Sequence, residues 1–329
     1  MKQTEQSDAL QTALANLRKK YGDGVVIQSG GDGEKVETLQ TGSFVLDHIM
    51  GHGLPVGRII DVFGQESSGK STLCMFIAGH IQKAGGTVAF IDAEHAYDMT
   101  YASTLGIDTG KLLVSQPSTL EETFDIIRAY AATNAVNLVI VDSVAALTPK
   151  SELEGEEMLK DTIAIQARLM SKALRIITGP VAKSKMTVIF ISQLRDKIGV
   201  MFGEKTVASG GKALKFYASL RLSVARGEKI KGKNDEQIGN VLKITAVKNK
   251  VAPPFRSGEI TLYYGSGIDM VKDTFDTAVA HEVIAKVGNT YSFNNKKLGV
   301  GEDSTIVAMQ KDGALYESIR DEIVKKSAK

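Results

Sequence analysis

The most informative segment of this chain runs from Ile59 to Ser71 and reads IIDVFGQESSGKS. Its apolar first half predicts a buried strand, and the apolar spacing over residues 72–84 predicts a helix directly after it. Between them stands the pattern G-x-x-x-x-G-K-S, which in this strand-to-helix setting indicates a phosphate-binding P-loop. Backbone N–H groups of such a loop face the phosphates, and the helix N-terminus favours an anion. The segment therefore predicts a nucleoside triphosphate site.

Each position of this loop has an expected role. Lys70 should reach the β- and γ-phosphates, and the Ser71 hydroxyl should ligate Mg²⁺. The alternative, a glycine- and serine-rich turn before an ordinary helix, is disfavoured because motif and context agree. The expected nucleotide-binding residues are Gly64, Gln65, Glu66, Ser67, Ser68, Gly69, Lys70, Ser71 and Thr72.

Two further apolar strands end in acidic residues. Leu138 to Asp142 resembles a Walker B strand, in which Asp142 would hold the metal, partly through water. Phe90-Ile91-Asp92-Ala93-Glu94 is the second, and either Asp92 or Glu94 could activate the attacking water. Spacing alone does not choose between these two acids. The histidines show no metal-ligand spacing, and no Ser-His-Asp arrangement supports a nucleophilic hydrolase.

The wider pattern is typical of an α/β protein. Short apolar strands alternate with helical segments from about residue 34 to 268, which predicts a mostly parallel twisted sheet flanked by helices. More β-like segments after residue 208 should extend the sheet with antiparallel strands. An N-terminal helix–strand arm precedes this core, with the helix over 6–20 and the strand at 25–27. A small C-terminal α/β domain follows, with helices near 273–287 and 314–327 and a hairpin around 291–297. The expected domains are residues 1–33, 34–268 and 269–329.

Composition narrows the class of protein. The 329 residues include one cysteine, Cys74, which excludes an internal disulfide framework and a cysteine-cluster zinc site. There is no apolar run of the length that spans a membrane, and the first residues lack the apolar core of a signal peptide. We therefore expect a cytoplasmic protein.

Basic residues concentrate in one part of the chain. Residues 194–256 contain 14 lysines or arginines against 5 acids, whereas the net charge of the whole chain is only +2. This asymmetry suggests a polyanion partner held through its phosphates. Within it, glycines bracket an apolar loop in which Ile198, Val200 and Met201 could wedge between bases while Arg195 and Lys197 bind backbone. The alternative is a solvated lysine-rich face.

Several longer strings resemble the bacterial RecA recombinase family over nearly the whole chain. Beyond the P-loop, the matching strings are residues 41–43, 90–96, 141–150, 197–203, 213–219 and 247–250. A generic P-loop protein would share only the P-loop and a loose Walker B strand. The resemblance implies a RecA-type P-loop ATPase core. It also implies a DNA-dependent ATPase that forms a filament on single-stranded DNA and pairs it with homologous double-stranded DNA in recombination and repair.

The resemblance also implies roles for individual residues at the ATP site. Glu94 becomes the base for the attacking water, and Gln193 the sensor of the γ-phosphate. Asp98 and Tyr101 would contact the adenine. Lys248 and Lys250 would reach the ATP of the neighbouring subunit and add positive charge to its transition state. The expected cofactors are ATP and Mg²⁺, with Ser71 and Asp142 at the metal.

Partners follow from the same resemblance. The residues expected to bind DNA are Arg168, Arg195, Lys197, Ile198, Gly199, Val200, Gly210, Gly211 and Lys212. Lys215, Phe216 and the N-terminal arm would join subunits head to tail, a contact that builds an open helix when its rotation does not close. SOS co-protease activity toward a LexA-like repressor is implied as well.

Three departures from the family pattern stand out. Ser192 replaces the asparagine that usually precedes the glutamine sensor, which affects the tuning of the ATP switch. The first DNA loop, expected near residues 154–165, lacks its usual glycine, and Ile163 is a candidate for the residue that wedges bases. The chain ends at Lys329 without an acidic tail, so we expect easier loading onto duplex DNA and less need for extra Mg²⁺.

Three other classes of protein were weighed. A hexameric helicase or clock-type ATPase shares the core and differs in forming a closed ring. A small-molecule kinase shares the P-loop, but the basic excess argues against it. A non-catalytic DNA-binding protein is disfavoured because Lys70, Ser71, Glu94 and Asp142 are all present.

Overall fold

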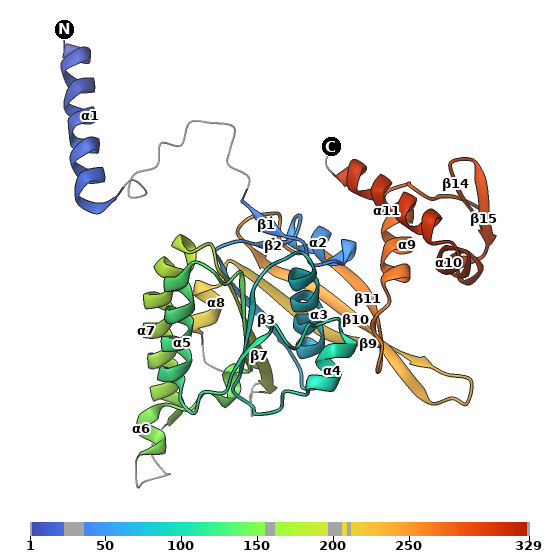
Figure 1. Cartoon of the computed structure of the whole chain (residues 1–329), viewed down its shortest axis with the longest axis horizontal. Helices are drawn as coiled ribbons and strands as arrows, with labels where there is room; N and C mark the ends of the chain where they lie inside the picture. The colour runs from blue at the N-terminus through green and yellow to red at the C-terminus, as the bar shows by residue number, and fades with distance from the viewer. Residues whose placement is uncertain (1, 23–35, 155–161, 197–205, 209–211, 328–329) are drawn as a thin grey trace. The chain divides into compact units, whose positions relative to one another are not determined.

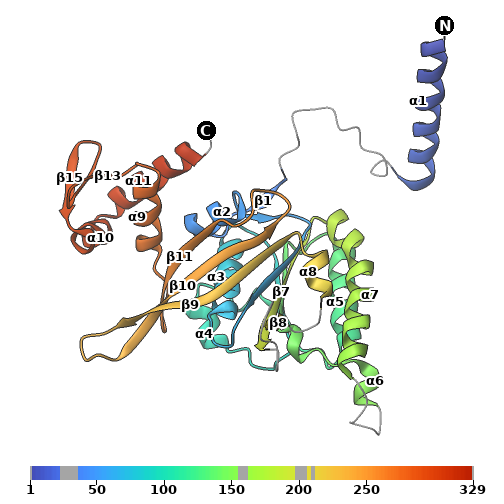
Figure 2. The same ribbon diagram turned by 180° about the vertical axis from the view of Figure 1, so that it is seen from behind.

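A computed structural model describes residues 2–22, 36–154, 162–196, 206–208 and 212–327 (Figures 1 and 2). Met1–Val36 and Glu37–Lys329 form two separate compact units. The first contains α1 (Lys2–Tyr21), which confirms the predicted N-terminal helix and extends it at both ends. Leu10 and Leu17 of α1 are 59% and 40% exposed, so this helix carries apolar surface that its own unit does not bury. The strand expected at 25–27 lies outside the described residues.

The second unit is built on a ten-stranded sheet with the order β12-β11-β10-β9-β3-β7-β6-β4-β5, with β8 pairing β7. Six strands are parallel, and they are β9, β3, β7, β6, β4 and β5. Beyond β9 the strands β10, β11 and β12 are antiparallel, as the sequence predicts. The strand bounds are β3 (Ile59–Gly64), β4 (Val88–Asp92), β5 (Leu113–Ser115), β6 (Leu138–Asp142), β7 (Thr187–Asp196), β8 (Thr206–Ala208), β9 (Leu220–Lys231), β10 (Gln237–Asn249), β11 (Ser257–Tyr263) and β12 (Gly267–Ile268).

Helices cover both faces of this sheet. Figure 1 shows α5 and α7 on one face and α2, α3 and α4 on the other. The bounds are α2 (Phe44–Met50), α3 (Lys70–Lys83), α4 (Met99–Thr104), α5 (Leu120–Thr133), α6 (Lys150–Leu153), α7 (Thr162–Lys183) and α8 (Ala213–Tyr217), with a 3-10 turn at Val144–Ala146. A separate two-stranded pair, β1 (Thr38–Leu39) and β2 (Leu54–Pro55), flanks α2.

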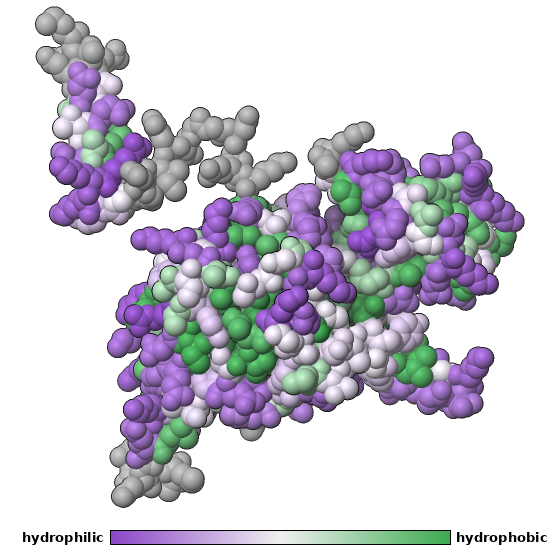
Figure 3. Space-filling model, viewed as in Figure 1, coloured by the Kyte–Doolittle hydropathy of each residue, from purple (hydrophilic) through white to green (hydrophobic). Residues whose placement is uncertain are grey.

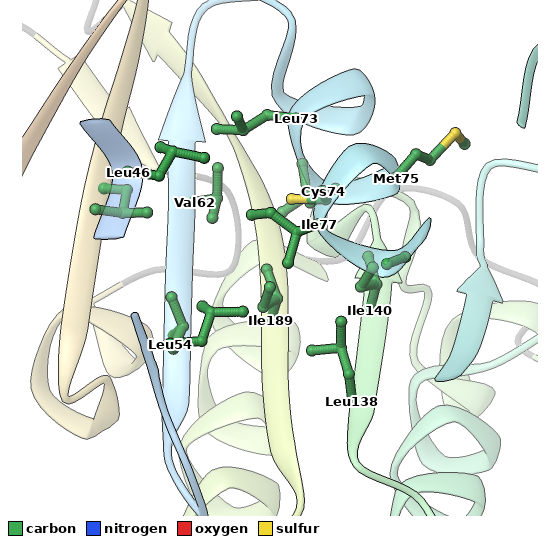
Figure 4. Close-up of a cluster of buried hydrophobic side chains, with 14 of the residues drawn as sticks. Leu46, Leu54, Val62, Leu73, Cys74, Met75, Ile77, Leu138, Ile140 and Ile189 are labelled. Carbon is green, nitrogen blue, oxygen red and sulfur yellow. The ribbon is translucent and has the colours of Figure 1, made fainter. Parts of the chain in front are cut away.

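The side chains of the central strands point alternately to the two faces of the sheet and form one apolar core on each face. In β6, Leu138 and Ile140 point toward α3, whereas Val139 and Val141 point toward α5 and α7. Figure 4 shows Cys74 and Ile77 of α3 over the first of these faces. Because successive side chains of a strand point to opposite faces, a strand buried on both sides must be apolar throughout. This explains why the sequence shows near-continuous apolar runs here.

The C-terminal part packs around its own apolar cluster, which includes Phe275, Tyr291 and Ile319. Its elements are α9 (Met270–Ala280), β13 (Ala285–Val287), β14 (Thr290–Phe293), β15 (Lys296–Val300), α10 (Glu302–Lys311) and α11 (Gly313–Ser327). The predicted hairpin and last helix are confirmed. The helix expected over 273–287 is wrong in its second half, because the chain turns at Glu282, where φ is +54°, and continues as a strand.

Asp273 of α9 ties this part to the core by capping α2. Its Oδ1 accepts a hydrogen bond from Ser43 Oγ at 2.5 Å, and its Oδ2 accepts one from Phe44 N at 2.8 Å. A carboxylate at a helix N-terminus satisfies free N–H groups and suits the helix dipole. The domain boundaries drawn at residues 33 and 268 stay a prediction.

Candidate functional site

The P-loop lies between β3 and α3, and its backbone is held from behind by β9. A Cβ at Gly64 would stand 2.1 Å from Val224 O, so only glycine permits this close approach. Gly69 caps α3 with φ of +88°, a conformation that glycine adopts without strain. Arg226 Nη2 donates to Ser67 O at 2.6 Å. The loop is therefore shaped by β9 as well as by its own sequence.

Lys70 is the first residue of α3 and is largely buried. Its Nζ donates to Gln65 O at 2.7 Å, which holds the ammonium group inside the loop. Burial lowers the pKa of Lys70, while Asp142, Cys74, Glu94 and Glu66 oppose that shift. The ammonium group and the acids around it therefore occupy one small volume beside the loop.

Asp142 ends β6 next to this lysine. Burial raises the pKa of Asp142 to about 6, with Glu94 and Asp92 adding to the rise, while a hydrogen bond from Ser71 lowers it. A hydroxyl and a carboxylate together offer the oxygen ligands that Mg²⁺ prefers, and the crowding of acids is what a cation would relieve. These residues fit a magnesium site. Among the described residues, no group of three or more His, Cys, Asp or Glu forms a separate metal cluster.

The two acids after β4 occupy different environments. Asp92 is 2% exposed, and it accepts hydrogen bonds from Ala96 N, Tyr97 N and Gln116 Nε2. Its oxygens are thus occupied in shaping the loop that follows the strand. Glu94 is exposed, accepts a hydrogen bond from Ser143 Oγ, and lies 3.2 Å from Gln193 Nε2. Of the two, only Glu94 presents its carboxylate to solvent beside the P-loop.

Gln193 belongs to β7, a strand that extends beyond the sheet. β7 runs parallel to β3 through Gln193, which pairs with Gly64. It then continues as a hairpin with β8, in which Leu194 pairs with Ala208 and Asp196 with Thr206. Residues 197–205 connect these two strands. One continuous strand therefore joins the Glu94 side chain to the base of the segment expected to bind DNA.

The residues expected at the adenine border α4. Tyr101 Oη lies 2.8 Å from Thr72 Oγ1, which ties α4 to the P-loop helix. Asp98 is the N-cap of α4 and accepts hydrogen bonds from the N–H groups of Thr100 and Tyr101. Both residues therefore lie at one edge of the phosphate site, while adenine contact stays a prediction.

Lys248 and Lys250 lie at the opposite end of the strands. Lys248 pairs with Arg221 of β9, which is level with Asp61, three residues before the P-loop begins at Gly64. Its Nζ donates to Lys215 O at 2.7 Å and to Phe216 O at 3.0 Å, at the end of α8. Phe216 is 68% exposed. The two lysines and this aromatic ring therefore lie together, away from the P-loop of their own chain.

The residues expected to bind DNA are only partly described. Arg168 on α7 and Lys212 before α8 are exposed. Arg195 belongs to the backbone of β7, and Ile163 to the first turn of α7. The first DNA loop expected near 154–165 therefore gives way to helix at Thr162. Lys197, Ile198, Gly199, Val200, Gly210 and Gly211 lie outside the described residues.

Within the described part of the basic stretch, the positively charged side chains lie in separate places. Lys229, Lys231 and Lys233 lie at the end of the β9–β10 hairpin, which Figure 3 shows as strongly hydrophilic. Lys231 is paired there with Asp235 at 2.7 Å. Lys248 and Arg256 lie elsewhere, near α8 and α2. The excess of positive charge is thus divided among separate parts of the fold.

Sequence reasoning missed three residues that shape the site. Ser143 donates to Glu94, Gln116 holds Asp92, and Arg226 holds the P-loop backbone. Ser143 directly follows the Walker B acid, so its position offered a signal. Gln116 and Arg226 come from distant segments and carry no local pattern.

A buried ion pair joins β3, the strand before the P-loop, to β9. Arg221 Nε donates to Asp61 Oδ2 at 2.8 Å, and Ser192 Oγ donates to Asp61 Oδ1 at 2.8 Å. Burial raises the pKa of Asp61, and Arg221 opposes the rise. Ser192, the departure noted in the sequence, thus connects the strand of the glutamine sensor to the strand of the P-loop.

Comparison with known proteins gives consistent results. The RecA N-terminal domain family matches residues 8–269, and the RecA C-terminal domain family matches residues 272–328. Protein RecA of Mycoplasma mycoides is 49% identical over 308 residues, covering 93% of this chain and 89% of that protein. Protein RecA of Chlorobium limicola is 46% identical over 314 residues, covering 94% and 89%.

A solved structure resembles the fold. The crystal structure of the RadB recombinase aligns with a TM-score of 0.52 and 22% identity, covering 70% of this chain and 98% of that one. At that identity the likeness concerns the fold alone. None of the described helices is long and apolar enough to cross a membrane.

Proposed function

This chain belongs to the RecA family of ATP-hydrolysing recombinases, which act in homologous recombination and repair, and from that premise we propose how its residues work. ATP binds the P-loop of one subunit, and a neighbouring subunit completes the site. Single-stranded DNA, bound at the segment between β7 and β8, switches hydrolysis on. The hydrogen bond from Gln193 to Glu94 carries this proposal, because it connects the two sites.

At the ATP site, the P-loop N–H groups and Lys70 bind the phosphates. Ser71 and Asp142 would hold Mg²⁺, partly through water, and the bound ion would supply positive charge to the phosphate oxygens. Glu94 accepts a proton from water as the water oxygen attacks the γ-phosphorus, and the bond to the bridging oxygen breaks to release ADP. The exposed position of Glu94 beside Lys70 and Asp142 supports this role.

Gln193 acts as the link between nucleotide and DNA. In the described arrangement its amide donates to Glu94, which keeps that carboxylate oriented. When a γ-phosphate offers a competing oxygen, the amide turns toward it, and the strand that continues into the β7–β8 hairpin shifts with it. This is the order-and-release logic of nucleotide switches.

Lys248 and Lys250 serve the ATP of the adjacent subunit. Their distance along the strands from their own P-loop supports a contact in trans, as does the exposed Phe216 beside Lys248. A head-to-tail contact of this kind repeats along an open helix. Assembly on DNA then brings positive charge to each transition state.

Three finer points also stand as proposals. Arg168, Arg195, Lys197 and Lys212, with the glycines at 210 and 211, hold DNA phosphates, while Ile198 inserts between bases. The filament promotes self-cleavage of a LexA-like repressor. The protein works in the cytoplasm.

The experiment is ATP hydrolysis with and without single-stranded DNA, at two salt concentrations, with Lys70→Ala as the inactive control. We expect strong stimulation by single strands that fades at high salt, because phosphate contacts weaken as salt rises. Robust hydrolysis that ignores DNA at both salt concentrations would overturn the proposed coupling.

A further inference from the structure

A pocket of about 550 Å³ opens where α2, the segment before β11, and helices α9 and α11 meet. Its lining includes His48, His52, Arg256, Thr277 and His281. None of these residues belongs to the P-loop or to the group around Glu94, and none entered the proposed function. The pocket is therefore a separate feature of this chain.

Basic side chains crowd this pocket. The rings of His48 and His281 lie edge to face, with centroids 5.9 Å apart, and Arg256 Nη1 donates to His48 O at 3.0 Å. Burial lowers the pKa of His48, and Arg256, His281 and His52 lower it further. The neighbouring side chains that lower the pKa of His48 are thus all basic residues. Such a cluster becomes stable when an anion lies among its members.

Thr277 supplies an independent observation. It lines the pocket from α9 and is 6% exposed, and its Oγ1 is buried with no hydrogen-bond partner among the described residues. A buried hydroxyl without a partner costs free energy, so most such groups in native proteins are satisfied. Because Thr277 lines the pocket, an oxygen atom bound there is a partner that this hydroxyl otherwise lacks.

One acid also lines the pocket, but it is already engaged. Asp47 Oδ1 accepts hydrogen bonds from Thr41 N at 3.0 Å and from Thr41 Oγ1 at 2.7 Å. Those bonds hold its charge on the inner side of α2, where Asp47 is only 9% exposed. The open side of the pocket is left to the basic groups.

We propose that this pocket binds a phosphate group, with Arg256 and the three histidines around the anion and the Thr277 hydroxyl donating to one of its oxygens. The planar guanidinium of Arg256 and the ring N–H groups of the histidines are hydrogen-bond donors, which suits a tetrahedral anion. The phosphate comes either from free orthophosphate or from a nucleotide. Helices α9 and α11 supply part of the pocket lining, so a phosphate bound in the pocket would stabilise the packing of the C-terminal part against α2.

Equilibrium dialysis of radiolabelled orthophosphate tests this proposal on the full chain carrying Lys70→Ala, which weakens phosphate binding at the P-loop. We expect one phosphate per chain. Adding Thr277→Val should weaken binding about tenfold, because a hydrogen bond to a charged group is lost. The same change should leave the midpoint of thermal unfolding unaltered or raise it, since it removes an unsatisfied buried hydroxyl.

Arg256→Gln should weaken binding by about tenfold or more, and Lys311→Gln is its matched control. Lys311 is an exposed cation on α10 that does not line the pocket, so removing it should leave affinity unchanged. If Arg256→Gln fails to fold, Thr277→Val alone decides. Competition with AMP identifies the source, because AMP displaces the label well only where a nucleotide is preferred.

Two results would overturn the proposal. One is no phosphate bound by the Lys70→Ala chain at millimolar concentration. The other is an affinity in the Thr277→Val and Arg256→Gln chains equal to that of the chain carrying Lys70→Ala alone. The outcome is separable from the recombinase function. DNA-stimulated hydrolysis in chains that retain Lys70 reports on that function, and the pocket variants should leave it intact.

Discussion

Gln193 Nε2 lies 3.2 Å from Glu94 Oε1, although the two residues are 99 positions apart in the chain. Glu94 follows β4 and Gln193 lies near the end of β7, so the contact crosses β6, which separates the two strands in the sheet. Gln193 contacts the Glu94 carboxylate, and it also belongs to the strand that leads to the segment expected to bind DNA. A change at either site can therefore move this side chain. The first two predictions concern this pair.

Glu94→Gln should abolish turnover and spare nucleotide binding. The amide keeps the size of the side chain but cannot accept the proton of water, so kcat should fall by about 10²- to 10⁴-fold. Steady-state hydrolysis with single-stranded DNA, together with a fluorescent nucleotide titration, separates the two effects. Glu317→Gln, at an exposed acid on α11, is the control. Normal hydrolysis by the Glu94→Gln chain would show that another residue accepts the proton.

Gln193→Ala should uncouple hydrolysis from DNA. Removing the amide breaks the connection between β7 and Glu94, so the stimulation by single strands should fall by roughly tenfold or more, the usual size of coupling between two sites. The DNA-independent rate should be retained, because Lys70, Ser71 and Glu94 stay in place. The measurement is the ratio of rates with and without DNA. An unchanged ratio would show that another route carries the coupling.

Lys248→Ala should stop hydrolysis without preventing nucleotide binding. A cation supplied in trans to a phosphoryl transition state typically contributes about 10³-fold or more to kcat. Lys243→Ala is the matched control, because Lys243 lies on the same strand and its Nζ is 3.2 Å from the exposed Glu259, a surface pair of small energetic weight. Electron microscopy should check assembly, since Lys248 also holds the end of α8.

Mixing inactive chains sharpens that test. A Lys248→Ala chain keeps its own P-loop, and a Lys70→Ala chain keeps the lysine that a neighbour needs. If Lys248 works across the subunit contact, activity should reappear in the mixture although each chain alone is inactive. A mixture as inactive as its components would place Lys248 in its own subunit.

Stability should respond to pH through two buried carboxyls beside α2. Burial raises the pKa of Asp47 and of Asp273 to about 6, from an ordinary value of 3.8. The folded chain therefore keeps protons in this window that the unfolded chain releases. Their contribution to the free energy of unfolding is complete below pH 3.8 and is lost as pH rises through 6, by about 1 kcal/mol for each group between pH 5 and pH 7.

Urea unfolding at pH 5 and pH 7 measures this change. The side chain in Asp47→Asn keeps an oxygen that accepts from Thr41 but cannot ionise. The decrease in the free energy of unfolding between pH 5 and pH 7 should therefore be smaller by the contribution of this one carboxyl. Asp321→Asn, an exposed acid on α11, should leave the difference unaltered. If Asp47→Asn and the unsubstituted chain lose the same amount, this carboxyl does not titrate in the window.

The sequence predicts features that are local and fails for those that need distant residues. The P-loop, the Walker B strand and the parallel strands were predictable because each pattern is contiguous. The choice between Asp92 and Glu94 was not, since it depends on Gln116, which follows β5, and on Gln193 of β7. Asp273 is likewise 230 positions from the Ser43 that it contacts. Periodicity carries no information about such pairs.

The wrong prediction has a physical cause as well. The helix expected over 273–287 is too long because Val283 and Ile284 continue the apolar spacing, yet they reach the C-terminal core from the bend between α9 and β13. The basic residues are close together in the sequence, whereas β-strand geometry distributes the described lysines of this stretch between the two ends of β9 and β10. Composition counts charges and does not position them.

The single cysteine, Cys74, can report on local opening of α3, the helix that follows the P-loop. Cys74 is fully buried beneath the P-loop, and burial raises the pKa of its thiol well above the ordinary value. A thiol in that state reacts with maleimide only while α3 is lifted from the sheet, because the thiolate is the reactive form. The rate at which maleimide labels the unmodified protein therefore measures how often the structure opens locally at the P-loop. Cysteines introduced elsewhere on the surface can carry dyes without competition from it.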